Sequence, residues 1–169
     1  LADRTQREGP EIQLVQGNEL IEVRARVDLA HQRTEVQIRG WDDVAVAVVA
    51  ETAGADVITA EVATGRTGPT VLAGVFPDAS LVRSRRDVRT SELARRYAQA
   101  EMRRRARGFV TVDGVTAGTP DLVPGARLDL RRVGAPFEGA GYWVCHAHHS
   151  FDLVHGHRTR FRAERPVVR

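Results

Sequence analysis

Five histidines near the C-terminal end of the sequence are the residues whose type and spacing best suit chemistry: His146, His148, His149, His155 and His157. Imidazole is a good ligand for zinc, copper or nickel, and a β-hairpin could bring several rings together. Strand geometry places His146 and His148 on one face and His149 on the other, with the last two beyond a turn. No HExxH pairing occurs, so we favour a hairpin with partly exposed histidines. A metal-binding enzyme that uses the His146–His157 cluster is the alternative.

Cys145 is the single cysteine of the chain, so an internal disulfide and a cysteine-rich zinc site are both excluded. As a nucleophile it would need a nearby base, yet its neighbour His146 points to the opposite strand face. His149 shares its face but lies about 13 Å away along a strand. The sequence also lacks a GxSxG elbow, a phosphate loop and a dinucleotide fingerprint. We therefore predict no enzyme activity and no catalytic, cofactor-binding or metal-binding residue.

All 25 basic side chains are arginines, which excludes Schiff-base chemistry and a phosphate-loop lysine. Residues 83–107 hold ten of them against Asp87, Glu92 and Glu101, a local charge of +7 in a chain of net charge +3. Such a segment could bind nucleic-acid phosphates. Its one aromatic residue, Tyr97, belongs to an apolar stripe, so platforms for base stacking are lacking. We favour a solvated face, or pairing with acidic residues of the remainder or of a neighbouring subunit. An Arg-rich nucleic-acid-binding module is the alternative.

The chain has 169 residues, 42% of them apolar, which suffices for one compact domain or two small ones. The longest apolar run, residues 44–50, is far shorter than the roughly 18 residues of a membrane helix. No signal or transit peptide is recognisable, and residues 1–10 are polar and indicate a loose leader. The sequence does not begin with methionine, which suggests a fragment of a longer protein. We expect a soluble chain that does not insert into membranes.

Alternation of apolar and polar residues predicts three strands in the N-terminal part, around residues 12–16, 20–29 and 35–39. Short turns join them, so we predict a β-meander within residues 1–52. Residues 43–51 are compatible with a strand or a short helix. Residues 53–89 are rich in glycine and proline and predict an irregular linker, with a short extended piece at residues 71–76.

A helix is predicted from about residue 90 to residue 107, because Thr90 or Ser91 can cap it and Glu92 suits its first turn. Apolar residues recur at helical spacing, and Gly108 follows as a natural stop. Beyond it, alternating segments predict strands at residues 109–115, 127–133, 142–151 and 159–164. Residues 90–169 therefore form a helix followed by a β portion, and the fold class is mainly β (α+β).

Turn and strand-end motifs follow one another in a characteristic order. They are Gly118-Thr119-Pro120-Asp121-Leu122, Pro124-Gly125, Gly134, Phe137, Gly139, Tyr142-Trp143-Val144, His149-Ser150-Phe151-Asp152, Gly156 and Thr159-Arg160-Phe161. Upstream, the segment 36–42 ends in Gly40-Trp41-Asp42. This order resembles the C-terminal half of the phage late control D family, which includes VgrG-type spikes and the hub proteins of contractile injection systems. The resemblance covers about residues 20–165. The histidines His146, His148 and His157 depart from the family pattern.

The resemblance implies antiparallel β-barrel domains of the phage tail hub, with residues 1–52 part of one barrel and residues 90–169 ending in another. It implies a structural hub or spike that joins an inner tube to a spike tip, as a homotrimer. The expected partners are the inner tube protein, the spike tip protein and baseplate components, with no nucleic acid and no cofactor. Assembly in the cytoplasm, followed by expulsion with the tube, is expected. His149 is expected to bond a backbone group across its hairpin, and Phe137 and Tyr142 to fill the barrel.

Overall fold

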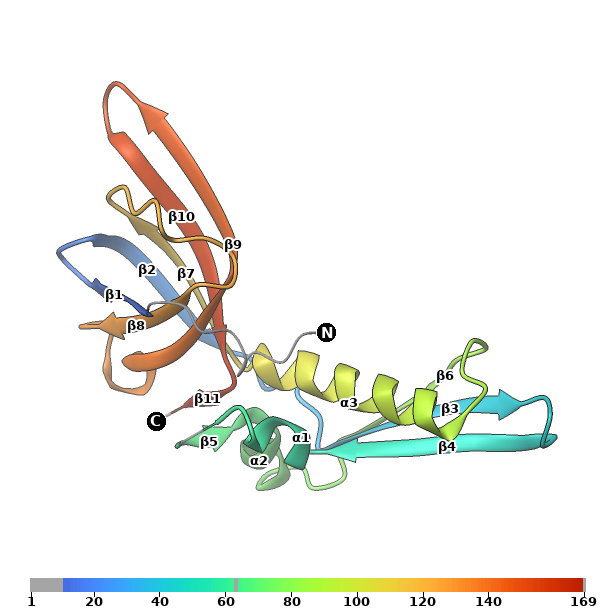
Figure 1. Cartoon of the computed structure of the whole chain (residues 1–169). Coiled ribbons are helices and arrows are strands. Elements are labelled where there is room, and N and C mark those ends of the chain that lie inside the picture. The colour runs from blue at the N-terminus through green and yellow to red at the C-terminus, as the bar shows by residue number, and fades with distance from the viewer. Residues whose placement is uncertain (1–10, 63, 169) are drawn as a thin grey trace. The chain divides into compact units, whose positions relative to one another are not determined.

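The computed structural model describes residues 11–62 and 64–168, which form two compact units (Figure 1). One unit consists of Leu29–Phe109, and we call it the helix unit. The other consists of the described residues before Leu29 and after Phe109, and we call it the sheet unit. The predicted leader at residues 1–10 lies outside the described residues.

The helix unit is built on a three-stranded sheet with the order β4-β3-β6. β3 (Glu35–Asp42) pairs antiparallel with β4 (Ala47–Gly54) and parallel with β6 (Ser80–Ser84). The long helix α3 (Ser91–Arg107) packs on this sheet through one shared apolar core (Figure 1). The buried core residues are Val36, Ile38, Val49, Ala53, Val88, Ala94, Ala98 and Met102.

The predicted helix is confirmed, and its two ends have the predicted chemistry. The Thr90 side chain accepts a hydrogen bond from the Leu93 backbone N–H (3.3 Å), which caps the first turn. Glu92 lies in that turn, and Gly108 is the C-cap residue. The ambiguous segment 43–51 is also resolved, because it is a turn followed by the start of β4.

Gly40 in β3 is required by a close approach of two backbone segments. A Cβ atom built on Gly40 would lie 2.0 Å from the Val88 carbonyl oxygen, which is far too close. The next residue, Trp41, donates its backbone N–H to that same oxygen (3.0 Å). The Gly-Trp-Asp motif of the sequence therefore marks the point where the segment before α3 fastens to β3.

The predicted extended piece at residues 71–76 is wrong, because residues 68–73 form a helix, α2 (Gly68–Ala73). The Thr67 side chain caps this helix by accepting the Thr70 N–H (3.3 Å), and a proline in the first turn is already fixed at a helical φ. The glycines and prolines that suggested a linker thus begin and end a helix. A shorter helix, α1 (Asp56–Thr59), and the two-residue strand β5 (Arg66–Thr67) precede it.

The sheet unit is a curled six-stranded sheet with the order β1-β8-β9-β10-β7-β2 (Figure 1). All its pairings are antiparallel except that of β1 with β8. A short 3-10 helix, η2 (Ala135–Phe137), precedes β9, and the strand β11 (Val167–Val168) ends the described chain. The six strands are β1 (Glu11–Val15), β2 (Leu20–Val27), β7 (Val110–Thr116), β8 (Arg127–Arg131), β9 (Gly139–Asp152) and β10 (Gly156–Arg165).

The three N-terminal strands exist as predicted, but the meander does not form. β1 pairs with β8, β2 pairs with β7, and β3 belongs to the other unit. Alternation identifies a strand by its burial pattern and says nothing of its partner, which here comes from far along the chain. The two units likewise do not follow the expected boundaries after residues 52 and 89, because helix α3 packs against β3 and β4.

The curled sheet buries one face of its strands. Leu14, Leu128, Leu130 and Tyr142 are fully buried there, and the Tyr142 hydroxyl donates to the Phe137 carbonyl oxygen (2.7 Å). This confirms Tyr142 as an interior residue. The opposite face of the central strands carries charged residues. Over both units, strands predominate and α3 is the one long helix among the described residues, so the predicted fold class, mainly β with one substantial helix, is confirmed.

Candidate functional site

The histidines lie on both faces of the β9–β10 hairpin rather than around one centre. His146 is paired in register with Arg162, and His148 with Arg160, so these four side chains share one face. His149 lies on the other face, where its ring centroid is 5.6 Å from that of His157. The Nδ1 atom of His155 is 3.2 Å from the Asp152 carboxylate at the tip of the hairpin.

His149 fastens the hairpin to the turn that follows β7. Its Nδ1 atom is 2.9 Å from the Thr159 hydroxyl, which in turn donates to the Thr119 carbonyl oxygen (3.4 Å). Gly118 has a φ of +61°, and a Cβ atom there would come within 3.1 Å of the His157 side chain. The expected cross-hairpin bond of His149 is therefore present, but it is made to a hydroxyl group instead of a backbone group.

Among the described residues, no group of side chains is arranged to bind a metal ion or to activate the Cys145 thiol. Within residues 11–62 and 64–168, no three His, Cys, Asp or Glu side chains are grouped so that they could hold a metal ion. Cys145 is exposed, and its thiol donates to the Arg162 carbonyl oxygen (3.2 Å). The sequence-based argument assumed regular alternation at Cys145 and His146, but the β9–β10 register shifts there, because Arg162 pairs with His146 and Ala163 with Val144.

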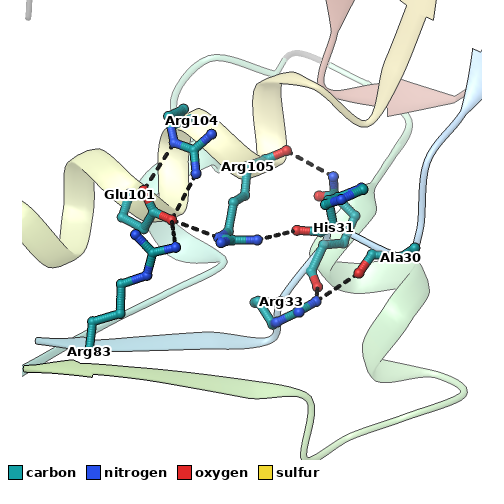
Figure 2. Close-up of polar contacts among 8 residues, drawn as sticks. Ala30, His31, Arg33, Arg83, Glu101, Arg104 and Arg105 are labelled. Atoms are coloured by element: carbon teal, nitrogen blue, oxygen red, sulfur yellow. Dashed lines mark hydrogen bonds and ion pairs between the residues drawn. The ribbon is translucent and has the colours of Figure 1, made fainter.

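Most arginines of α3 and its flanks are held by carboxylates of the same unit, and Glu101 is the centre of the largest group (Figure 2). Glu101 accepts hydrogen bonds from Arg104 (3.0 and 2.9 Å) and Arg105 (2.9 Å), and Arg83 approaches to 3.7 Å. Arg105 also donates to the His31 carbonyl oxygen (2.9 Å). The hydrogen bond from Arg104, assisted by the positive charges of its neighbours, holds the pKa of Glu101 below its ordinary value.

Four further carboxylates pair with arginines of residues 83–107. Asp87 binds Arg85 (3.0 and 2.9 Å), which together with the Tyr97 hydroxyl lowers the pKa of Asp87 to about 2. The other pairs are Asp43 with Arg89, Glu92 with Arg95 and Arg96, and Glu61 with Arg107. Asp43 and Glu61 lie in the remainder of the chain, where the interpretation expected the acidic partners, whereas Asp87, Glu92 and Glu101 belong to residues 83–107 themselves.

A second group of charges lies on the outer face of the curled sheet, and we call it the cationic face. Register across β9, β10, β7 and β2 aligns His146, Arg162, Asp113 and Arg24 in one row. The adjacent row contains His148, Arg160, Val115 and Glu22. These rows and Arg26 line a shallow groove of about 1120 Å³.

Asp113 is the electrostatic centre of the cationic face. Its Oδ1 atom accepts a hydrogen bond from Arg162 Nε (2.7 Å), and its Oδ2 atom accepts one from Arg26 Nη2 (2.9 Å). The bond from Arg162 is the main reason that the pKa of Asp113 lies below its ordinary value, and the same bond raises the pKa of Arg162. Both carboxylate oxygens are therefore occupied by arginines from two different strands.

Sequence reasoning did not find the cationic face. Its signal is present, because arginines alternate along residues 24–26 and 158–162, and alternate residues of a strand share a face. The two segments lie on either side of β7 because of the order of strands in the sheet. Alternation along a strand does not reveal this order.

Each unit also has a long hairpin whose tip exposes apolar side chains from a turn closed by an aspartate. Asp152 accepts the backbone N–H groups of Val154 (2.8 Å) and His155 (2.6 Å), and Asp42 accepts those of Val44 (2.8 Å) and Ala45 (2.9 Å). These bonds lower the pKa of both aspartates. The exposed apolar residues at the tips are Phe151, Leu153 and Val154 in one hairpin and Val44, Val46 and Val48 in the other.

Several solved structures have this fold. The chain matches the 43 kDa tail protein of prophage MuSo2 from Shewanella oneidensis with a TM-score of 0.64 and 13% identity, over 92% of this chain and 43% of that one. It matches the tail protein from Neisseria meningitidis MC58 with a TM-score of 0.57 and 10% identity, over 92% and 44%. A chain of the native gene transfer agent virion gives a TM-score of 0.54 and 11% identity, over 94% and 32%. The chain thus spans less than half the length of these structures, and it shares their fold.

No curated protein matches the sequence. Among the described residues, no helix has the length and apolar character that crossing a membrane requires. The family model of the Alg8 N-terminal domain matches residues 2–152. This match includes most of both units, and the chain belongs to the Alg8 N-terminal domain family.

Proposed function

We propose that the chain is a structural hub component of a contractile injection system or phage-tail-like particle, where it joins the inner tube to the spike tip. The observation that carries this proposal is the fold. More than nine-tenths of the chain superimposes on two phage tail proteins and on a chain of a gene transfer agent virion. The chain also belongs to the Alg8 N-terminal domain family.

The residues behind the late control D resemblance support a structural role. Gly40 lets β3 meet the segment before α3, and Gly118 lets a turn pack on His157. Within the sheet unit, the Tyr142 hydroxyl donates a hydrogen bond to the Phe137 carbonyl oxygen, and the His149 ring is hydrogen-bonded to the Thr159 hydroxyl. These residues hold turns and strand ends in place. Such a role suits a protein whose function is structural.

A non-enzymatic role fits the arrangement of the polar side chains. Most arginines of α3 are held by carboxylates, and the histidines of β9 and β10 point to two faces of one hairpin. Side chains held in this way stabilise a scaffold. We propose that the protein acts by its shape and its contacts.

A homotrimer is the proposed oligomeric state, with the inner tube protein, the spike tip protein and baseplate components as partners. Exposed apolar tips are expected in a subunit of a larger assembly, because the free energy falls when a partner covers apolar side chains and removes them from water. Leu153 is 97% exposed and Val154 is 84% exposed. In this proposal the particle assembles in the cytoplasm, and the hub is expelled with the tube when the sheath contracts.

The test is the mass of the full-length protein in solution, measured by light scattering on a size-exclusion column, with and without the inner tube protein. Three copies per complex are expected. A monomer under both conditions would contradict the trimeric hub. In parallel, electron microscopy of particles from cells that lack the chain should show no complete particles, and supplying the chain again should restore them. Normal particles without it would refute the structural role.

A further inference from the structure

We propose that the cationic face of the sheet unit binds an acidic protein segment that presents at least two carboxylates to Arg24 and Arg160. This inference does not depend on the hub role, because it concerns the charges of one sheet face.

The first step is that two arginines of the cationic face are not held by either of its carboxylates, Asp113 and Glu22. Asp113 uses both oxygens on Arg26 and Arg162. Arg24 and Arg160 are exposed, and neither side chain makes a hydrogen bond or an ion pair within the part of the chain that the structure describes. Two guanidinium groups therefore remain available to carboxylates from elsewhere.

The second step is that the two available arginines have a fixed separation. Arg24 is opposite Asp113 in the β2–β7 register, and Arg160 is opposite Val115 in the β10–β7 register. The two arginines are thus two strands and two residues apart, which places their Cα atoms about 12 Å from each other. In an extended segment, residues four positions apart are separated by about 13 Å, so carboxylates at that spacing would match both arginines. Guanidinium groups can bind carboxylates in a bidentate manner, which adds geometric specificity.

The third step is that the face suits a protein better than a nucleic acid. Glu22 and Asp113 interrupt the arginines, and their negative charges would repel a continuous row of phosphates. Among the described residues, Phe161 is the one Phe, Tyr or Trp side chain that lines the groove, and it is only 4% exposed, which leaves the imidazoles of His146 and His148 as the ring surfaces for base stacking. A protein segment can place carboxylates at the two arginines and uncharged residues beside Glu22.

His146 and His148 extend the same face toward β9. They lie opposite Arg162 and Arg160 in the β9–β10 register, and both are exposed. A carboxylate at Arg160 would thus lie next to an imidazole that can donate a further hydrogen bond. The face therefore offers donors from three strands to an acidic segment, while Asp113 on β7 occupies the middle and Glu22 lies on the edge strand β2.

The test measures fluorescence anisotropy of a labelled ten-residue glutamate peptide as the full chain is added at low salt. The variants are Arg24→Gln, Arg160→Gln and the double variant. The matched control is Arg86→Gln, because Arg86 is an exposed arginine of the helix unit for which the described residues provide no ion pair. Each single variant should weaken binding about fivefold and the double variant about 20-fold, as expected for exposed charge pairs. The control should change binding less than twofold, and binding should weaken with added salt.

Three results would overturn the proposal. They are no binding of the peptide by the unaltered chain, equal binding by the double variant, and an equal loss in the Arg86 control. A labelled ten-nucleotide oligothymidylate is measured in the same way. If it bound more tightly than the peptide and lost affinity in the double variant, the face would be a nucleic-acid site instead. Because Arg24 and Arg160 are exposed, far-ultraviolet circular dichroism should confirm that every variant is folded. The oligomeric mass is a separate measurement, so failure of the hub proposal and failure of this one are distinguishable.

Discussion

In the helix unit, most arginines in and near α3 bind a carboxylate, whereas on the cationic face of the sheet unit one aspartate, Asp113, binds Arg26 and Arg162. Glu101 binds both Arg104 and Arg105, and Glu61 binds Arg107. On the cationic face, Asp113 is saturated by Arg26 and Arg162.

This difference shows that the number of arginines in a segment does not determine the availability of positive charge. The segment 83–107 has the higher density of arginine, yet most of these side chains are neutralised by acids from the same unit. The sheet unit has fewer arginines but leaves Arg24 and Arg160 to the solvent. Binding therefore depends on how many carboxylates face the guanidinium groups, and substitutions of these carboxylates or arginines test the contrast.

The largest effect is expected for Glu61→Gln. The side chains of Glu61 and Arg107 are only 8% and 10% exposed, so Glu61→Gln removes the negative charge from an ion pair that is nearly buried. Breaking such a pair should lower the free energy of unfolding by about 3 kcal/mol. Urea denaturation followed by circular dichroism measures this change.

The matched control for that experiment is Glu92→Gln. Glu92 also binds two arginines, Arg95 and Arg96, but on the exposed side of α3. Its replacement should change stability far less, since exposed ion pairs contribute little. Equal losses in Glu61→Gln and Glu92→Gln would show that burial does not distinguish the two pairs.

The second effect concerns pH, and Glu101 is the group that reports it. Hydrogen bonding to Arg104 holds the pKa of Glu101 below its ordinary value of 4.5, so the ionised carboxylate stabilises the folded chain above that pH. This stabilisation is lost as the pH falls through the lowered pKa of the folded state. Glu101→Gln should cost about 2 kcal/mol at neutral pH and should reduce the acid sensitivity of the remaining stability.

Urea midpoints measured from about pH 6 to about pH 3 would show this difference as two curves that converge toward acid. Asp87, Asp113 and Asp152 also have lowered pKa values, so acid sensitivity should decrease without vanishing. Parallel curves for the unaltered chain and Glu101→Gln would contradict the role of Glu101.

The outcome of the sequence analysis follows from the range of each interaction. Local signals were sufficient for α3, because Thr90, Glu92 and Gly108 act on residues within one helical turn. They failed for residues 68–73, where the cap at Thr67 lies in a segment rich in breakers. They also failed for the meander, because the partners of β1 and β2 are β8 and β7, more than 80 residues away in sequence.

The same reasoning applies to the candidate site. The alternation of β9 correctly separates His146 and His148 from His149, since adjacent strand residues alternate by geometry. The cationic face requires β7 to lie between β2 and β10, which brings Asp113 between Arg24 and Arg162. Sheet order of this kind depends on long-range contacts and could not be predicted from spacing.

A third, smaller effect is expected for Arg162→Ala. Arg162 donates to one oxygen of Asp113, and its loss would leave this partly exposed carboxylate with Arg26 alone. The free energy of unfolding should fall by about 1 kcal/mol, near the upper limit for exposed pairs. Urea denaturation at neutral pH measures it, and the loss should diminish in an Asp113→Asn background, where the pair no longer exists. An undiminished loss would mean that the Arg162 stem, rather than its charge, stabilises the sheet.

The smallest effect, and the sharpest test of the contrast between the units, is expected for Arg160→Ala. Arg160 has no ion pair within the described part of the chain, and it lies on the same face as Arg162. Its removal takes away one positive charge from a crowded face without leaving a carboxylate unsatisfied. The free energy of unfolding should therefore change by less than about 0.5 kcal/mol, and it should rise slightly at low salt, where repulsion between arginines is strongest. A loss as large as that of Arg162→Ala would mean that Arg160 stabilises the fold, and the positive charge of the sheet unit would then be as fully used as that of the helix unit.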